Sequence, residues 1–413
     1  MMSSPMAERR AMMGTPMAER VVPDPAPLVA AAAAALQVET VSDFDSFLDL
    51  EPAWNRLLDE AAIDNPFLRH EWFRTWWECF GDGRQLHVLT VRTGRELIAI
   101  APLMLSRERV YGLTVRRLRT IANAHTQRAD WIVARGAEDA LRALWDGLVS
   151  QKALWDVVVL CQVPGGSATL SRVPALAAEG GFRVVLARTT DSPCIYLAGR
   201  WEDYLNGLAR KHRSNLRNRL KRLEQIGPVT LEVIQDGPEV GPALEEGLRI
   251  EAAAWKGHAR SAILSRPELS RFYRQFAAWA AQRGWLRLQF LNVGGRRIAF
   301  GYSLCYKRRL YLLKPGYDPA YARYSPSNIL IYLALRDAFA SGIVAYDLLG
   351  ANDPWKREWT TEATPHAWLF VFGETPRARA LYFAKAHLVP WLKRVYRACR
   401  HLTPTLSSRV PER

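Results

Sequence analysis

The stretch that decides the fold is YLLKPGYDPAYARYSPSNILIYLALRDAFASGIVAYDLLGANDPWKREW, residues 311–359. Its first residues predict a strand that ends near Lys314, and a loop with three tyrosines follows. Ser325-Pro326-Ser327-Asn328 then opens a helix over 325–342, because serine is a favoured N-cap and proline suits the first helical turn. The run VAYDLL at 344–349 predicts a second strand. The segment is therefore a strand, a turn, a helix and a strand.

The turn at 325–328 has the chemistry of an anion site. The first N–H groups of a helix have no partner within the helix, and the helix dipole adds partial positive charge there. Phosphate groups bind well at such positions. From the residues alone, a plain capped helix and a phosphate site both remain open.

Two stretches on either side alternate like β-hairpins. One spans 86–108 with a turn at Thr93–Gly94, and the other spans 286–318 with a turn at Gly294–Gly295. Each follows an aromatic-rich helical stretch, at 67–80 and 269–284, and GRELIAIA at 94–101 resembles GRRIAFG at 295–301. The shared order predicts two copies of one mixed α/β unit.

Helices and strands alternate after each hairpin. The first hairpin is followed by a helix around 138–151, a strand at 155–163, another helix and a strand near 182–187. Because such segments come after antiparallel strands, we expect mixed sheets flanked by helices, which is an α+β fold of two tandem units.

These features divide the chain into four parts. They are a disordered tail (1–36), an N-terminal unit (37–190), a C-terminal unit (191–374), and a basic C-terminal helix and tail (375–413). The helix of the last part is predicted over 377–402, with an interruption at Pro390. The tail is rich in proline and methionine and contains PMAER twice, and its run LVAAAAAAL at 28–36 is too short to span a membrane.

Charge and cysteine usage restrict the possible partners and the compartment. The net charge is +15, of which residues 210–222 carry +7 and residues 375–413 carry +8, so the rest is formally neutral. Two local basic surfaces on a neutral body predict specific anionic partners. The five cysteines are scattered without a CxxC, and the eight histidines show no ligand spacing. We therefore expect a cytoplasmic protein without a metal or a disulfide framework.

Several motifs in order resemble one enzyme superfamily. The chain resembles GNAT acyltransferases. The features that carry the resemblance are YDPAYARYSPS, the helix after it, the strand ending in Asp347, DPWK at 353–356, EAAAWKG at 251–257 and the basic helix before Gly227. The best match is the CelD-like (also BioF2-like) branch named for bacterial cellulose biosynthesis, which is related to Fem-type transferases. The resemblance covers roughly residues 40–373 and is strongest in 200–360. It implies two tandem GNAT-like units.

The resemblance also implies a donor site for acetyl-CoA or another acyl-CoA. The pyrophosphate would lie on the helix N-terminus at Ser325, Pro326, Ser327 and Asn328, and a backbone N–H at Leu313 or Lys314 would polarise the thioester. Glu251 or Asp347 would be the base, Tyr317, Tyr321 or Tyr324 the acid, and Lys356 a cation for phosphate or carboxylate. Because the first hairpin lacks a Ser-Pro turn, the first unit would be the half without the donor.

Two positions depart from the family pattern. The usual Ser-Pro-Gly turn is Ser-Pro-Ser here, so the Cβ of Ser327 makes close approach by a phosphate less easy. Trp355-Lys356 stands where the family usually has Tyr-Lys. If the tyrosine hydroxyl takes part in the chemistry, this protein lacks it, and if the ring only stacks, tryptophan serves as well.

The acceptor is predicted from the basic helix and the EAAAWKG segment. The basic side chains share a stripe beside an apolar one, and Arg213 and Arg217 would bind an anionic acceptor such as a nucleotide sugar, a lipid-linked sugar or a polysaccharide precursor. Trp255 would form a wall of the acceptor pocket and Lys256 an anion contact. A solvated basic face, a core Trp255 and a solvated Lys256 remain open alternatives. His212 and the tryptophans at 72, 76 and 77 are predicted to be packed.

The sequence thus predicts an acyl-CoA-dependent N- or O-acyltransferase of envelope or exopolysaccharide metabolism. Its acceptor would be a small molecule or a glycan- or lipid-linked group, and the protein could contact the anionic inner face of a membrane through its C-terminal helix. One alternative is a Fem-like enzyme with an aminoacyl-tRNA donor, tRNA being the only nucleic acid expected as a partner. The other is a catalytically silent protein that binds nucleic acid or another anion.

Overall fold

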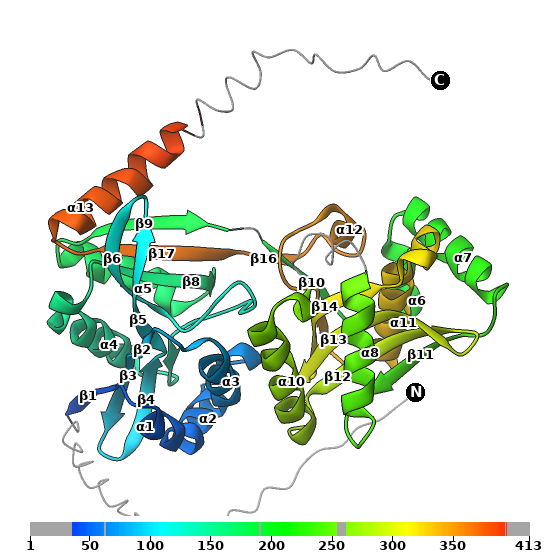
Figure 1. Ribbon diagram of the computed structural model, residues 1–413, viewed down its shortest axis with the longest axis horizontal. Helices are drawn as coiled ribbons and strands as arrows, with labels where there is room; N and C mark the ends of the chain where they lie inside the picture. Colours follow the sequence, from blue (N-terminus) through cyan, green and yellow to red (C-terminus); the bar gives the residue numbers. More distant parts are fainter. Residues whose placement is uncertain (1–34, 62, 190, 254–261, 393, 395–413) are drawn as a thin grey trace, which may run out of the picture. The chain divides into compact units, whose positions relative to one another are not determined.

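The computed structural model describes residues 35–61, 63–189, 191–253, 262–392 and 394. The chain from Leu36 to Arg413 forms one compact unit, to which the following description applies. Within it, two α/β halves follow each other along the sequence, called here the first and second halves (Figure 1).

The first half contains two sheets and five α-helices. Its strands are β1 (Leu36–Val41), β2 (Gln85–Leu86), β3 (Val88–Thr93), β4 (Glu96–Ala101), β5 (Leu103–Val110), β6 (Leu113–Thr120), β7 (Ile132–Val133), β8 (Val157–Pro164) and β9 (Arg183–Arg188). Its helices are α1 (Phe44–Asp49), α2 (Glu51–Glu60), α3 (His70–Phe80), α4 (Glu138–Ser150) and α5 (Ala168–Glu179). Pro102 separates β4 from β5, which belong to different sheets.

The second half is built on one seven-stranded sheet. Its strands are β10 (Ser192–Tyr196), β11 (Val229–Ile234), β12 (Leu286–Val293), β13 (Arg296–Tyr306), β14 (Arg309–Tyr317), β15 (Ala345–Asp347) and β16 (Ala363–Thr364). Its helices are α6 (Trp201–Gly207), α7 (Arg210–Glu224), α8 (Val240–Ala253), α10 (Pro267–Gln282), α11 (Pro326–Ala340) and α12 (Pro354–Arg357), with a 3₁₀ turn η4 at Pro319–Tyr324. The chain ends with β17 (His366–Phe372) and α13 (Pro376–Phe383).

Strand order confirms the predicted duplication and the α+β class. The sheet of the second half has the order β11-β12-β13-β14-β15-β10-β16. The first half follows a corresponding order over two sheets, β1-β3-β4-β7 and β2-β5-β6-β8-β17-β9. In both halves the strand after the hairpin region pairs in parallel with the strand that follows a helix: β6 with β8, and β14 with β15. The two halves are therefore tandem units with mixed sheets.

One strand crosses from the end of the second half to the first. β17 comes last along the chain but pairs antiparallel with β8 and β9 of the first half, where it appears as the orange strand in Figure 1. β10, which follows the first half, pairs antiparallel with β15 of the second. Residues 366–372 therefore belong to the sheet of the first half, which corrects the sequence-based boundary at 374. β17 thus completes the sheet of the first half with a strand from beyond the second half.

Aromatic side chains of α3 join the halves. Trp72 is fully buried and packs edge-on against Phe272 and Phe276 of α10, with ring centroids 5.0 and 4.7 Å apart. Trp76 is buried as well, and Trp77 packs at the edge of the same core. These tryptophans are core residues, as their helical spacing predicts.

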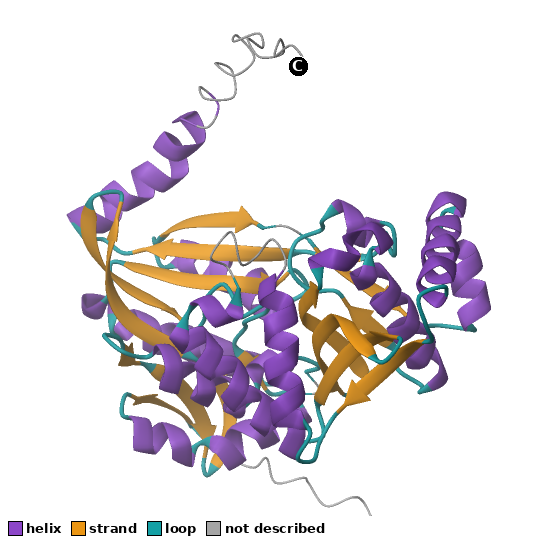
Figure 2. Ribbon diagram, turned by 45° about the vertical axis from the view of Figure 1, so that its right-hand side comes forward, coloured by secondary structure: helices purple, strands orange, loops and turns teal. Residues whose placement is uncertain are grey.

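The C-terminal helix does not break at Pro390. After α13 the backbone makes one π-helical turn at Ala384–Leu388 and stays helical through 389–392. A wider turn before a proline accommodates the ring and the missing N–H, which explains why the helix continues. Figure 2 shows this helix projecting from the end of the strands of the first half. No helix in the described ranges is long and apolar enough to cross a membrane.

Two buried histidines predict that mild acid weakens the fold. Burial lowers the pKa of His70 and of His366 to about 4. Unfolded histidine has a pKa of about 6.5, so the unfolded chain binds more protons below that pH, and the stability is lost as the pH falls from 6.5 toward 4. Burial raises the pKa of Asp130 to about 6, which opposes this trend by about 1 kcal/mol. We expect these three groups together to cost roughly 3 kcal/mol between pH 7.5 and 5, and His125, whose pKa burial lowers to about 3, adds to the loss.

Urea unfolding at the two pH values measures this loss. His70→Gln removes one of the two groups and should reduce the difference by about 2 kcal/mol, which is about two-thirds of the loss from His70, His366 and Asp130 together. Equal stability at both pH values would contradict the assignment of both rings as neutral.

Candidate active site

The central strands of the second half part and leave an opening. β14 and β15 pair only from Arg309–Tyr311 to Ala345–Asp347. Beyond that point β14 continues to Tyr317 paired with β13, whereas the chain after Asp347 turns away. A cavity of about 420 Å³ lies between the two and extends to the first turn of α11. We call it the donor cavity.

Many of the predicted residues line this cavity. They are Leu313, Tyr317, Ser325, Pro326, Ser327, Asn328, Trp355 and Lys356. Most of its surface is apolar, from Leu312, Leu348, Leu349 and neighbouring side chains. The predicted Lys314, Tyr324, Asp347, Glu251, Arg213 and Arg217 lie outside the lining, and Trp255 and Lys256 fall outside the described residues. The lining therefore includes the predicted donor residues apart from Lys314, and of the acceptor residues that the structure describes, Arg213 and Arg217 are not part of it.

A β-bulge stands at the predicted backbone donor. Tyr302 of β13 faces Lys314, but the next residue, Ser303, faces Leu312, so Leu313 is an extra residue in β14. A bulge takes its residue out of the regular ladder and re-aims its groups. The bulge therefore leaves Leu313 in the cavity wall with backbone groups outside the ladder.

The turn before α11 differs from the predicted capping geometry. Ser325 occupies the N-cap position but is left-handed, with φ 48° and ψ 61°, and its side chain makes no capping hydrogen bond. Its carbonyl accepts the Asn328 N–H at 3.0 Å instead. Ser327, at the second helical position, has an N–H to which the helix itself offers no acceptor. A left-handed non-glycine residue is costly and is typical of functional turns.

Lys356 supports the opposite wall of the cavity. Its ammonium donates to the carbonyls of Leu349 and Ala351 at 2.6 and 2.8 Å, and the residue is buried, with 6% of its surface exposed. Leu349 and Gly350 have positive φ angles of 49° and 59°, a conformation that these bonds hold in place. The prediction of Lys356 as a catalytic cation is therefore replaced by a positioning role. The Trp355 ring lies beside it, 5.4 Å from the ammonium.

Asp347 is part of an ion pair between the halves and not a free base. Its carboxylate pairs with Arg128 of the first half and accepts the Leu349 N–H at 3.0 Å. Both side chains are buried, and Arg128 also donates to His366 at 3.3 Å. The prediction of Asp347 as a general base is corrected because the guanidinium already engages the carboxylate in the interior.

Glu251 lies directly behind the cavity wall. It is 1% exposed on α8, and it accepts the Ile263 N–H at 3.0 Å. Gly316 of β14 packs on its backbone, since an ideal Cβ at Gly316 would lie 2.5 Å from the Glu251 Cα. Among the tyrosines, Tyr317 lines the cavity, whereas Tyr324 is buried under the Arg323 guanidinium. Glu251 and Tyr317 remain the candidates for base and acid.

The basic helix α7 lies on the donor side. It packs against α11 and η4. Its His212 is buried edge-on against Trp359, and the Trp359 indole donates to Asn328 at 3.4 Å. His212 is thus packed, as predicted. Arg213 donates to the Asn206 carbonyl at 2.7 Å, and Arg217 is exposed. This placement favours contact with a donor over the predicted contact with an acceptor.

The first half contributes two residues that sequence reasoning missed. Gln127 lines the donor cavity, and the neighbouring Arg128 pairs with Asp347. Both come from the loop between β6 and β7, about two hundred positions from the rest of the site. The sequence offers no local motif that marks them. Among the described residues, no group of three or more His, Cys, Asp or Glu side chains is placed to hold a metal ion.

Comparisons with known proteins agree with this geometry. Residues 210–357 match the Acetyltransferase (GNAT) domain family. The solved structure of FemX is similar with a TM-score of 0.56 and 13% identity, over 83% of this chain and 98% of that chain. The C-terminal domain of an Agrobacterium fabrum protein named as a lysylphosphatidylglycerol synthetase is similar with a TM-score of 0.50 and 15% identity, over 82% of this chain and 96% of that chain. No curated protein matches by sequence.

Fold and domain match together define the class. The second half carries a GNAT acetyltransferase domain, and the protein is an acyltransferase with two tandem GNAT-like units. The two solved structures are only 13% and 15% identical to this chain in sequence, so their similarity concerns the fold alone.

Proposed function

We propose that the protein transfers an acyl group from an acyl-CoA bound in the donor cavity. The observation that carries this proposal is the parting of β14 and β15, with the bulge at Leu313 on one side and the open turn of α11 on the other. An apolar slot that ends at the Ser327 N–H, on the positive end of the helix dipole, suits a thioester arm that ends in a pyrophosphate.

The residues around the slot suit acyl transfer by direct attack. The Leu313 N–H would polarise the thioester carbonyl, which stabilises the oxyanion of the transition state. An amine or hydroxyl of the acceptor attacks the carbonyl carbon, and the C–S bond breaks. Glu251, directly or through water, would take the proton of the acceptor, and Tyr317 would give one to the leaving thiolate. Otherwise, positioning of the two substrates provides the catalysis.

The acceptor we propose is an anionic, envelope- or polysaccharide-related molecule. The motifs shared with the CelD-like branch support exopolysaccharide metabolism, and the net charge of +15 supports an anionic partner. N- and O-transfer need the same geometry at Leu313 and differ only in the nucleophile.

A charge at Ser327 tests the donor site. Ser327→Asp places a carboxylate where the donor pyrophosphate would lie, and we expect acetyl-CoA and longer acyl-CoAs to bind at least tenfold more weakly. Ser327→Asn is the matched control, because it has the same shape without the charge. Thermal-shift titration measures both, and a ligand at about a hundred times its dissociation constant should add about 2.7 kcal/mol to the native chain. Equal responses in the two variants would sink the assignment of the turn.

A second candidate donor is an aminoacyl-tRNA. It is favoured by α7, whose basic side chains lie beside α11 near the donor turn. A tRNA donor would bind with a steep salt dependence, and neutral variants of α7 would reduce the slope. Binding of tRNA without any response to acyl-CoA would select this donor.

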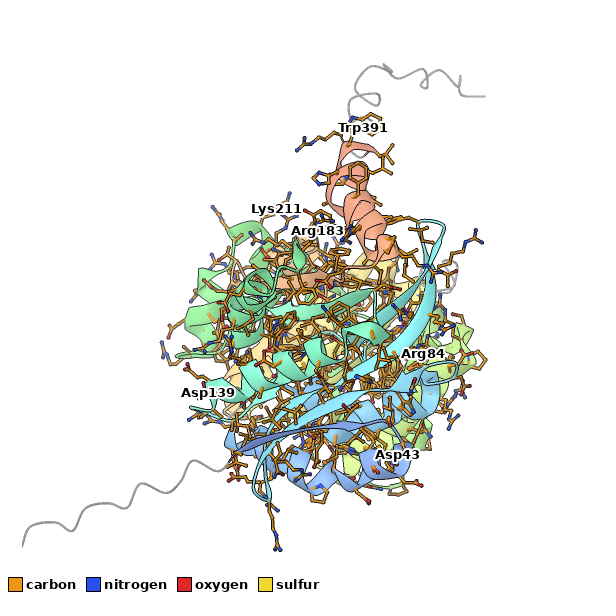
Figure 3. All side chains as sticks on the ribbon, turned by 90° about the vertical axis from the view of Figure 1, so that its left-hand side faces the viewer. Asp43, Arg84, Asp139, Arg183, Lys211 and Trp391 are labelled. Atoms are coloured by element: carbon orange, nitrogen blue, oxygen red, sulfur yellow. The ribbon has the colours of Figure 1, made fainter. Side chains whose placement is uncertain are left out.

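The C-terminal helix supports contact with an anionic membrane surface. Phe383 and Trp391 are 61% and 58% exposed, and Leu388 and Leu392 are exposed near them. Figure 3 labels Trp391 on the helix where it stands away from the sheets. Lys385 and Arg394 lie on the same helix. Apolar side chains next to cations match the boundary between headgroups and acyl chains.

Vesicle binding measures this contact. We expect the protein to bind vesicles of phosphatidylglycerol and phosphatidylcholine and to bind pure phosphatidylcholine more weakly. Phe383→Ser with Trp391→Ser should reduce binding at least tenfold, because two large apolar side chains no longer enter the interface. Leu186→Ser is the control, since Leu186 is 56% exposed on β9. An equal effect of the control would contradict a role for the helix.

A further inference from the structure

A second cavity lies where the two halves meet. It has a volume of about 270 Å³ and is lined by α3, β6 and the loop after it, and the start of α10. Three arginines from separate elements face it: Arg84 after α3, Arg119 on β6 and Arg266 before α10. Trp76 and Phe80 add an aromatic wall. We call it the arginine cavity, and no motif in the sequence marks it.

The arginine cavity has more positive than negative charge. Arg84 donates to the backbone carbonyls of Phe80 and Asp82, which leave its charge uncompensated. Arg119 donates to Glu108 at 3.1 Å, but within the described chain its buried Nε has no hydrogen-bond partner. Arg266 is exposed, and Glu268 is the carboxylate in the lining. Glu108 therefore compensates Arg119 from outside the lining, and Glu268 is left as the lining carboxylate against both Arg84 and Arg266, so the space keeps an excess of positive charge.

One loop of the first half joins this cavity to the donor cavity. Asn123, Ala124 and His125 line the arginine cavity, and Gln127, two residues later, lines the donor cavity. His125 Nδ1 lies 3.3 Å from the Tyr273 hydroxyl, and the Lys314 ammonium lies 5.8 Å from the Tyr273 ring. Lys314 follows the bulged Leu313. A short path of packed side chains thus leads from the arginines to β14, the strand whose Leu313 N–H would polarise the thioester carbonyl.

We propose that the arginine cavity binds a phosphate or pyrophosphate group of the acceptor. Arginine binds two oxygens of one phosphate at once, and three such groups on separate elements fix its orientation. The acceptor nucleophile would then extend along the loop at 122–127 toward Leu313. This assignment rests on the proposed acyl transfer, and it replaces Arg213 and Arg217 as acceptor residues because those lie on the donor side.

Binding of inorganic pyrophosphate at constant ionic strength tests the assignment. The midpoint of the thermal shift is measured for the native chain, Arg266→Gln, Arg119→Met and Arg109→Gln. Arg109→Gln is the control for Arg266→Gln, because both arginines are exposed and both substitutions remove one positive charge. Arg109 lies on β5 and does not line the cavity. We expect the two cavity variants to bind pyrophosphate at least tenfold more weakly, with the control unchanged and the acetyl-CoA response intact.

The outcomes separate this inference from the proposed donor. Loss at Arg266 and Arg119 alone supports the site even if acyl-CoA does not bind. An equal loss in Arg109→Gln, or a loss that appears only in Ser327→Asp, overturns it, as does the absence of pyrophosphate binding. UDP-N-acetylglucosamine and farnesyl pyrophosphate then distinguish the source of the phosphate, because the tighter ligand identifies a nucleotide-linked or a lipid-linked acceptor.

Discussion

Replacing Arg128 by methionine is expected to lower the free energy of unfolding by about 3–5 kcal/mol. The substitution leaves the carboxylate of Asp347 in the interior without its cation, and Asp347 is fully buried. The loss is large because desolvation of a charge is not offset once its partner is gone. Chemical denaturation with urea at pH 7.5 measures the change.

The double variant Arg128→Met with Asp347→Asn separates charge from packing. In the native chain the Asp347 carboxylate accepts the Leu349 N–H at 3.0 Å. Asparagine keeps an oxygen that can accept this N–H and removes the second charge. We expect it to regain at least half of the stability that Arg128→Met loses. A double variant as unstable as the single one would show that Arg128 acts through packing and not through the ion pair.

Gly316→Ala is expected to destabilise the protein by about 1–3 kcal/mol and to weaken donor binding. An ideal Cβ at this position would lie 2.5 Å from the Cα and 2.9 Å from the N of Glu251, so the backbones of β14 and α8 must separate. Gly316 also lines the donor cavity. The movement would therefore displace Glu251 from behind the wall. Urea unfolding and acetyl-CoA titration measure the two effects.

Gly241→Ala on the same helix is the matched control. Its Cβ would meet nothing within 4 Å, and alanine favours the helix by up to about 1 kcal/mol. The control should be neutral or stabilising. Similar losses at Gly316 and Gly241 would contradict the close contact between β14 and α8.

Local sequence predicted the parts of the fold whose signals lie close together. The run from Leu312 to Asp347 identified β14, the turn, α11 and β15 because alternation, a Ser-Pro turn and helical spacing stand in succession. The similar hairpins near Gly94 and Gly294 predicted the duplication. The resemblance of the same segment to GNAT acyltransferases implied part of the lining of the donor cavity, from Leu313 to Lys356, but not Gln127.

The features that sequence analysis missed depend on long-range contacts. β17 pairs with strands of the first half, although nothing in its alternation specifies a partner sheet. Arg128 and Asp347 meet across 219 positions, so Asp347 looked like a free carboxylate at the end of a strand. The left-handed Ser325 was unexpected, because its side chain suits capping and the surrounding turn imposes the backbone angle instead.

Hydrogen–deuterium exchange with and without acetyl-CoA tests the central claim most directly. The account predicts slower exchange in two segments, at 312–331 around the bulge and the turn and at 347–356 on the opposite wall, since these line one cavity. Exchange at 138–150 in α4, the equivalent helix of the first half, should stay unchanged. Protection confined to the first half, or no protection at saturating acetyl-CoA, would contradict a donor site between β14 and β15.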